Sequence, residues 1–476
     1  MSEFESKAQI EQLIASKTSH GQEGRLLKKQ MKLTNIPLLI MLFVILCLGI
    51  TILYSVSSPI GYAEQQDSLF YVKKQIRFTL IGLAFVVFFN FIDITKILFR
   101  KYMLVCILSG GLALALATAT LLFGQVYNNA RRWFVIAGFQ LQPSEFIKIL
   151  LVVSFASYRQ FIVNLRKSGK LRKEPGKRYW VRDSMLDFVV PVMGAIVVDA
   201  LILAEPHGSC ALIIAAVIAV SALASGIHWR SWVLGIAIML GFAIVIGAPT
   251  YMLMPDEQVA KIEQKVLSNF SHIFKRFEIF NKDENDEESK LTEDDTRQID
   301  SAHYALGSGG MWGVGMGMSR SKYNYISEAQ NDYIFSVYVE ETGFVGGMFL
   351  IIIYMIILAM CMAVIWHTKS VYYRVVATGC TAIIFIEAFM NIAVELQIIP
   401  STGVTLPFIS YGGSAQISLL IAFGLILGCS RYGTVEEETA AREIPASKEA
   451  PAAKEMPAPV NYTDNEEKDQ WNTDLL

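Results

Sequence analysis

Four carboxylates stand against one long apolar run in the segment YISEAQNDYIFSVYVEETGFVGGMFLIIIYMIILAMCM, which begins at Tyr325. Glu328 and Asp332 precede the run, and Glu340 and Glu341 lie in its first part. An ionised carboxylate inside hydrocarbon is costly, so carboxylates at such positions normally pair with other groups or carry a function. If Glu328 and Asp332 lie at the surface of the membrane, their ionisation costs little.

A second set of charges lies in NNARRWFVIAGFQLQPSEFIK, residues 128–148. Glu145 and Lys148 are three residues apart, so on a helix they share a face and can neutralise each other. Arg131 and Arg132 could simply extend from the membrane edge to water. A capped helix without any ligand explains this segment equally well.

Three further segments are polar or rich in glycine. The turn AEPHGSC (204–210) places Glu205 at a membrane edge, where it could act only as a helix cap. The segment NIAVELQIIPSTGVTLPFISYGGSAQ (391–416) predicts non-helical backbone at membrane depth, which is tolerated only inside protein or beside a watery cavity. A rigid loop needs no ligand, however.

The glycine cluster GSGGMWGVGMG (307–317) has no preceding strand, so it indicates a loop close to a membrane surface and not a dinucleotide site. No phosphate-binding motif and no Cys/His metal spacing occur in the sequence. We therefore expect no nucleotide cofactor and no nucleic-acid partner.

The elements that must position these residues are membrane helices. The chain of 476 residues is 53% hydrophobic and 18% charged, with a mean hydropathy of +0.42, whereas soluble domains are about 25% charged. Apolar runs of the length needed to cross a bilayer recur along it. We predict an all-α integral membrane protein with ten spans, at about 35–57, 76–93, 102–123, 144–162, 186–204, 209–226, 231–252, 333–365, 372–396 and 410–430.

The distribution of basic residues predicts the orientation. Lys and Arg crowd the segments 25–32, 96–101 and 166–182, and such segments normally face the cytoplasm. Ten spans then put both termini in the cytoplasm and a large loop, 253–332, outside between spans 7 and 8. All the polar segments above converge on the outer side, which favours a functional cavity there.

We divide the chain into a cytoplasmic segment (1–34), a membrane domain (35–432) and a disordered cytoplasmic tail (433–476). The tail is rich in Ala, Pro, Glu and Lys and has little to bury. The acidic run DENDEESKLTEDD (283–295) is most simply a solvated segment of the outer loop. None of the six cysteines forms a C-x-x-C pair, so they are predicted to be packing residues.

Three stretches together resemble the SEDS family (shape, elongation, division and sporulation), which includes FtsW, RodA and sporulation-type proteins. They are RRWFVIAGFQLQPSEFIK, GSGGMWGVGMGMSRSKYNYISEAQNDYIFSVYVEETGFVG and IIPSTGVTLPFISYGGS. The resemblance covers roughly residues 35–432. It implies a ten-helix membrane bundle that polymerises lipid II into peptidoglycan beside a class B penicillin-binding protein, in the cytoplasmic membrane of a bacterium.

The resemblance also implies roles for matching residues. Asp332 aligns with the essential acid of the family motif P-E-x-x-T-D-F-I-F, and Glu328 with its glutamate. Glu145 and Lys148 match the charged pair that follows Q-P-S-E. The family loop L-P-F-I-S-Y-G-G-S implies substrate contacts for Ser410, Tyr411, Gly412, Gly413 and Ser414.

The sequence departs from the family pattern at several positions. Ser327 replaces the usual proline, Asn331 the threonine and Tyr333 the phenylalanine, while His207 stands where an acid is usual. These changes leave the assignment of Asp332 intact, but they put a role for the 204–210 turn in doubt.

The reaction that this resemblance implies needs a base near a sugar hydroxyl and positive charge near a pyrophosphate leaving group. Asp332 is the expected base, with Glu328 in support, while Glu340 and Glu341 are expected to be structural or coupling groups. A bound Mg²⁺ or Mn²⁺ could offset the pyrophosphate. So could the cations Arg131, Arg132, Lys148, Arg320 and Lys322.

Two other functions stay open at this point. A transporter or flippase for lipid II would also use intramembrane charges and a broken re-entrant loop. The outward bias of the polar residues argues against it. A scaffold that recruits a crosslinking enzyme is compatible with catalysis.

Overall fold

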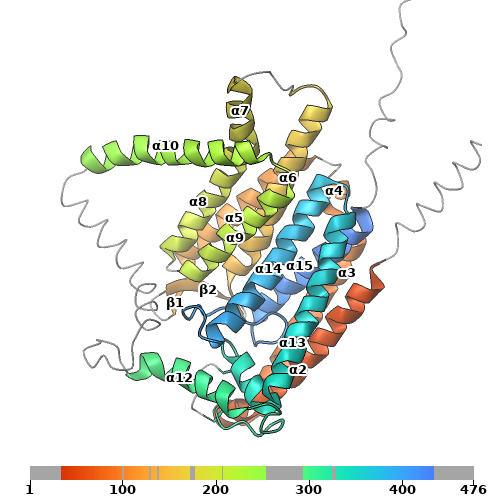
Figure 1. Ribbon diagram of the computed structural model, residues 1–476, viewed down its shortest axis with the longest axis vertical. Helices are drawn as coiled ribbons and strands as arrows, with labels where there is room; N and C mark the ends of the chain where they lie inside the picture. Colours follow the sequence, from red (N-terminus) through yellow and green to blue (C-terminus); the bar gives the residue numbers. More distant parts are fainter. Residues whose placement is uncertain are drawn as a thin grey trace, which may run out of the picture. The chain divides into compact units, whose positions relative to one another are not determined.

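Helices make up most of the chain in a computed structural model of the protein (Figure 1). The structure describes residues 34–98, 101–127, 130–136, 139–171, 177–205, 207–253, 293–323 and 329–433. These residues belong to one unit that extends to Val435. The expected cytoplasmic tail, most of the N-terminal segment, Glu328 and most of the acidic run 283–295 lie outside the described residues.

Seven helical segments among the described residues are long and apolar enough to cross a membrane. They are α2 (Ile36–Gln65), α5 (Tyr102–Phe123), α6 (Pro143–Lys167), Trp180–Ala204, α13 (Ile334–His367), α14 (Val371–Glu395) and α15 (Gly413–Tyr432). The segment Trp180–Ala204 comprises most of α7 (Lys177–Ser184), the π-helix η1 (Met185–Val189) and α8 (Val190–Ala204). The chain is therefore a mainly helical, multi-pass membrane protein.

The three other expected spans are also helical. They correspond to α3 (Phe70–Phe91), α9 (Gly208–Ala224) and α10 (Trp229–Leu253), and the short helices α4 (Ile94–Ile97) and α12 (Glu293–Ser308) complete the set. α10 packs against α7 and η1 and runs across the direction of α8 and α9 (Figure 1). The count of ten membrane-crossing helices thus stays a prediction.

Close packing of α3 on α15 depends on glycine. A Cβ atom added to Gly424 would lie 2.8 Å from the Cα of Val86, and one added to Gly428 would lie 2.5 Å from the carbonyl oxygen of Phe89. Gly424 and Gly428 are four residues apart, so they form a small-xxx-small surface of the kind that lets membrane helices approach closely.

A small antiparallel sheet precedes α6, which the all-helical prediction did not include. It has the order β1 (Gln125–Tyr127), β2 (Ala130–Ile136) and β3 (Phe139–Leu141), with Phe134 of β2 opposite Leu141 of β3. Alternation within these few residues is too short to separate a strand from a loop by pattern alone. The sheet contains Arg131 and Arg132, and it is followed by α6, which begins at Pro143.

α13 is broken at Gly343, whose backbone is non-helical (φ 72°, ψ −174°). Gly343 and Gly347 have the spacing of a small-xxx-small surface for helix packing, but the backbone of Gly343 departs from the helix. Only glycine adopts a positive φ without a steric penalty, so Gly343 ends one helical segment and starts the next.

Candidate active site

Asp332 lies in the turn just before α13, and its side chain is half-buried. Its backbone carbonyl accepts a hydrogen bond of 2.8 Å from Asn391 Nδ2 on α14. Gly403, in the loop between α14 and α15, lies against its carboxylate, because a Cβ on Gly403 would be 3.5 Å from Asp332 Oδ2. The predicted base therefore stands where the start of α13, the end of α14 and the loop between α14 and α15 meet.

One face of α14 supports this position. Glu387, Asn391 and Glu395 follow one another at intervals of four residues, so they form a single stripe along the helix, and all three are buried. Asn391 Nδ2 also donates to the carbonyl of Val404 at 2.8 Å, which ties the loop to the turn that carries Asp332.

Glu395 supplies the N-terminal cap of α13 from outside that helix. Its carboxylate accepts from the backbone N–H of Phe335 (3.3 Å) and from both the N–H (2.5 Å) and the hydroxyl (2.6 Å) of Ser336. The first N–H groups of a helix lack internal partners, and a carboxylate there also interacts favourably with the helix dipole. Tyr333 is the N-cap residue and makes no side-chain cap hydrogen bond, so the capping carboxylate belongs to Glu395.

Lys148 forms the centre of a buried charge cluster at the other end of the same α14 stripe. Its ammonium lies 2.9 Å from Glu145 Oε2 and forms a second ion pair with Glu387. The hydroxyl of Ser418 on α15 lies 3.4 Å from Glu145 Oε2. The predicted Glu145–Lys148 pairing is confirmed, and one cation here serves two carboxylates from two helices.

The loop between α14 and α15 is buried non-helical backbone, as its sequence predicted. Leu406, Phe408 and Ile409 are core residues. The Ser410 hydroxyl accepts from the N–H of Leu406 at 2.8 Å, and the Ser410 carbonyl accepts from Gln75 Nε2 at 3.2 Å. The loop is therefore held in one shape by α3 and by its own side chains.

The other loop residues expected to contact substrate, Tyr411 to Ser414, lie at the end of the loop and the start of α15. Tyr411 donates its N–H to the carbonyl of Gln330 (2.9 Å) and packs edge-on against Tyr71, with ring centroids 4.9 Å apart. Gly412 and Gly413 lead into α15, where Ser414 is buried in the first turn. The structure thus gives Ser410 and Tyr411 roles in fixing the loop, and contact with substrate stays a prediction.

The turn at 204–210, whose role the sequence left in doubt, lies beside the same loop. The Ser209 hydroxyl donates to the carbonyl of Thr402 at 2.7 Å, and His207 Nε2 is 3.5 Å from Gln142 Nε2. Burial of Glu205 raises the pKa of this carboxyl to about 8, and the cation of Arg132 opposes the shift. Arg131 on β2 is exposed.

Residues 36–434 match the sequence profile of the FtsW/RodA/SpoVE family of cell cycle proteins. The chain belongs to this family. That finding confirms the resemblance read from the sequence motifs.

Two curated relatives and two solved structures illustrate the likeness. Stage V sporulation protein E of Bacillus subtilis (strain 168) is 28% identical over 405 residues, which cover 84% of this chain and 97% of that protein. The probable peptidoglycan glycosyltransferase FtsW of the same organism is 27% identical over 420 residues, covering 88% and 96%.

The structure of the Thermus thermophilus rod shape determining protein RodA is similar in fold, with a TM-score of 0.54, 22% identity and coverage of 85% of this chain and 98% of that one. A chain from a peptidoglycan synthase complex that coordinates polymerization and crosslinking gives a TM-score of 0.57 at 21% identity, covering 85% and 99%. These likenesses show a common fold.

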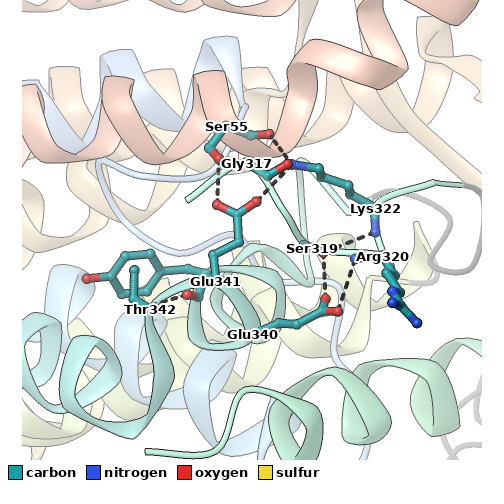
Figure 2. A network of polar contacts seen from close by, with 9 residues as sticks. Ser55, Gly317, Ser319, Arg320, Lys322, Glu340, Glu341 and Thr342 are labelled. Atoms are coloured by element: carbon teal, nitrogen blue, oxygen red, sulfur yellow. Dashed lines mark hydrogen bonds and ion pairs between the residues drawn. The ribbon is translucent and has the colours of Figure 1, made fainter. Parts of the chain in front are cut away.

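Two of the five cations expected to offset the pyrophosphate, Lys322 and Arg320, have different environments. Lys322 is only 3% exposed, and its ammonium lies 2.8 Å from Glu341 Oε1 and 2.7 Å from the carbonyl of Gly317 (Figure 2). Arg320 donates its backbone N–H to Glu340 Oε1 at 3.1 Å, while the residue itself is exposed. Lys322 is thus bound within the protein, whereas the Arg320 side chain reaches the surface.

The described residues do not form a metal cage by themselves. No group of three or more His, Cys, Asp or Glu side chains suited to a metal ion occurs within the described ranges. A divalent cation would need oxygen atoms of a bound pyrophosphate to complete its coordination. The divalent cation therefore stays a prediction.

Sequence reasoning missed Glu387 and Glu395. Both are carboxylates within an apolar run, which is a usable signal for function or pairing in a membrane helix. Their partners, Lys148 and the start of α13, lie far away in sequence, so no local spacing pointed to them.

Proposed function

We propose that this chain is a peptidoglycan glycosyltransferase that polymerises lipid II at the outer face of the bacterial cytoplasmic membrane. The observation that carries the proposal is the position of Asp332 in a member of the FtsW/RodA/SpoVE family. Asp332 is the motif acid, and it stands half-buried at the meeting point of α13, α14 and the loop between α14 and α15.

In the proposed reaction, a hydroxyl of one sugar attacks the anomeric carbon of a lipid-linked sugar. The new glycosidic bond forms as the bond to the polyprenyl pyrophosphate breaks, and the Asp332 carboxylate takes the hydroxyl proton. A base contributes most when its position is fixed, and Asn391 and Gly403 fix the backbone and the surroundings of Asp332.

The leaving pyrophosphate needs positive charge. Arg131 and Arg320 are exposed and so can meet a substrate from solvent or from the membrane surface. Lys148 and Lys322 are in buried ion pairs, and we propose that they hold the protein in shape instead of touching the pyrophosphate.

We further propose that both termini are cytoplasmic, that ten helices cross the membrane and that a class B penicillin-binding protein crosslinks the product. The likeness to a chain of a peptidoglycan synthase complex supports such a partner. The serial apolar helices and the basic segments between them support the topology.

A proteoliposome assay with labelled lipid II tests the activity. We expect the purified protein to produce glycan polymer when substrate is present on the side that carries Asp332. Movement of lipid II across the membrane without any polymer would contradict the proposal and would support a carrier.

A further inference from the structure

The break in α13 at Gly343 is filled by the glycine-rich loop that follows α12. A helix break leaves backbone groups without helical partners, and the backbone of the loop provides them. Four hydrogen bonds do so: Val314 N–H to Glu340 O (2.9 Å), Gly315 N–H to Glu341 O (3.0 Å), Phe344 N–H to Gly310 O (2.9 Å) and Val345 N–H to Met311 O (3.2 Å).

Two glycines make this contact possible. A Cβ on Gly343 would lie 2.4 Å from the backbone nitrogen of Gly313, and a Cβ on Gly313 would lie 2.2 Å from the carbonyl oxygen of Glu341. Both residues also have positive φ, 72° and 78°. The loop and the helix therefore meet backbone to backbone, and no side chain can stand between them.

The far end of the loop is fixed by the two adjacent carboxylates of α13 (Figure 2). Glu340 accepts from the Ser319 hydroxyl at 2.5 Å and from the Arg320 N–H. Glu341 accepts from the Ser55 hydroxyl of α2 at 2.5 Å and pairs with Lys322. Both carboxylates are buried, so they serve to attach the loop to α13 and α2.

The outward side of this attached loop is apolar. Trp312 is 78% exposed and Met318 70%, and Met311, Val314 and Met316 are exposed as well. No charged residue occurs from Ala305 to Ser319. A rigid, uncharged loop that presents tryptophan and methionine to its surroundings needs an apolar or amphipathic environment.

Its position along α13 indicates which environment that is. Beyond the break, residues 344–367 form about 36 Å of helix, enough to cross a hydrocarbon core of about 30 Å. This part of α13 exposes Phe344, Phe349, Ile352 and Met355, as a lipid-facing surface does. Because the loop bonds to the N–H groups of Phe344 and Val345, it lies at the end of that surface.

We propose that residues 311–318 lie in the interfacial layer of the membrane, where the headgroups meet the acyl chains, with Trp312 as the anchor. Tryptophan is enriched at this depth because its ring is amphipathic. The other end of the same helix carries Trp366, which is 85% exposed and matches the opposite interface. The proposal rests on the membrane character of the chain and goes beyond its proposed activity.

Fluorescence quenching by brominated lipid tests the proposal. The full chain is placed in nanodiscs of phosphatidylcholine, with or without bromine on the acyl chains near the headgroup. The emission of Trp312 is obtained as the difference between wild type and Trp312→Phe, and Trp366→Phe gives the matched difference for the opposite interface.

We expect brominated lipid to reduce the Trp312 emission by a fraction similar to that for Trp366. Red-shifted, unquenched Trp312 emission would mean that the loop stands in water and would overturn the proposal. Blue-shifted but unquenched emission would mean that protein covers the loop, and would overturn it as well.

Discussion

Asp332 and Glu395 are neighbouring carboxylates whose surroundings assign them different tasks. Glu395 is buried, and its oxygen atoms accept hydrogen bonds from the first turn of α13. Asp332 keeps part of its surface accessible and is held through its backbone carbonyl by Asn391. A general base must reach the proton it removes, so we propose the accessible Asp332 as the base, whereas the buried Glu395 caps α13.

Replacing Lys148 by methionine should destabilise the protein strongly. The change leaves the buried Glu387 and the partly buried Glu145 without their cation, and removing one partner of a buried pair typically costs about 3–5 kcal/mol. Thermal unfolding of the purified protein in detergent measures the loss. The double variant Lys148→Met, Glu387→Gln is the control and should recover part of the lost stability. Equal stability of wild type and Lys148→Met would show that the cluster contributes nothing.

Glu205 should make stability depend on pH. Its folded-state pKa is raised to about 8 from a usual value of 4.5, so the folded protein favours the protonated form. The unfolded chain gives up this proton first as the pH rises, and stability therefore falls between about pH 4.5 and pH 8.

The matched variant for this prediction is Glu205→Gln, which cannot titrate. As the pH increases over that range, the melting temperature of wild type should fall relative to that of Glu205→Gln. A difference that does not change with pH would mean that Glu205 titrates normally.

At the scale of elements, the apolar runs located the helices, but pattern could not show how α13 is interrupted. A glycine within an apolar run is equally compatible with a packing surface and with a break, and the choice at Gly343 depends on a loop about thirty residues upstream. The Glu145–Lys148 pair was predictable because both residues lie on one helix. Glu387 and Glu395 were not, because their partners come from other helices.

Gly343→Ala should therefore displace the glycine loop and lower the melting temperature. Its Cβ would collide with the backbone of Gly313 and Met311, and holding an L-residue at this φ and ψ costs about 1–3 kcal/mol in addition. Gly111→Ala on α5 is the control, because no atom lies within 4 Å of its added Cβ, and it should leave stability equal or slightly higher. Similar melting temperatures for both variants would show that the break is not required.

At the scale of the whole molecule, the membrane character and the helical class could be predicted because hydrocarbon imposes long apolar helices. The small sheet before α6 and the course of α10 across its neighbours could not be predicted, since neither follows from the apolar runs. Of the candidate site, the sequence motifs predicted Asp332, Glu145 and Lys148. Its supporting α14 stripe required the fold, which brings residues about sixty positions apart into contact.

The most direct test of the account is lipid II polymerisation by Asp332→Asn, compared with Glu395→Gln as the matched carboxylate-to-amide change. Both proteins are reconstituted in proteoliposomes at equal folded amounts, checked by thermal unfolding. We expect Asp332→Asn to form no glycan polymer while keeping the melting temperature of wild type, and Glu395→Gln to melt earlier but still polymerise. Polymerisation by Asp332→Asn at the wild-type rate would contradict the assignment of Asp332 as the base.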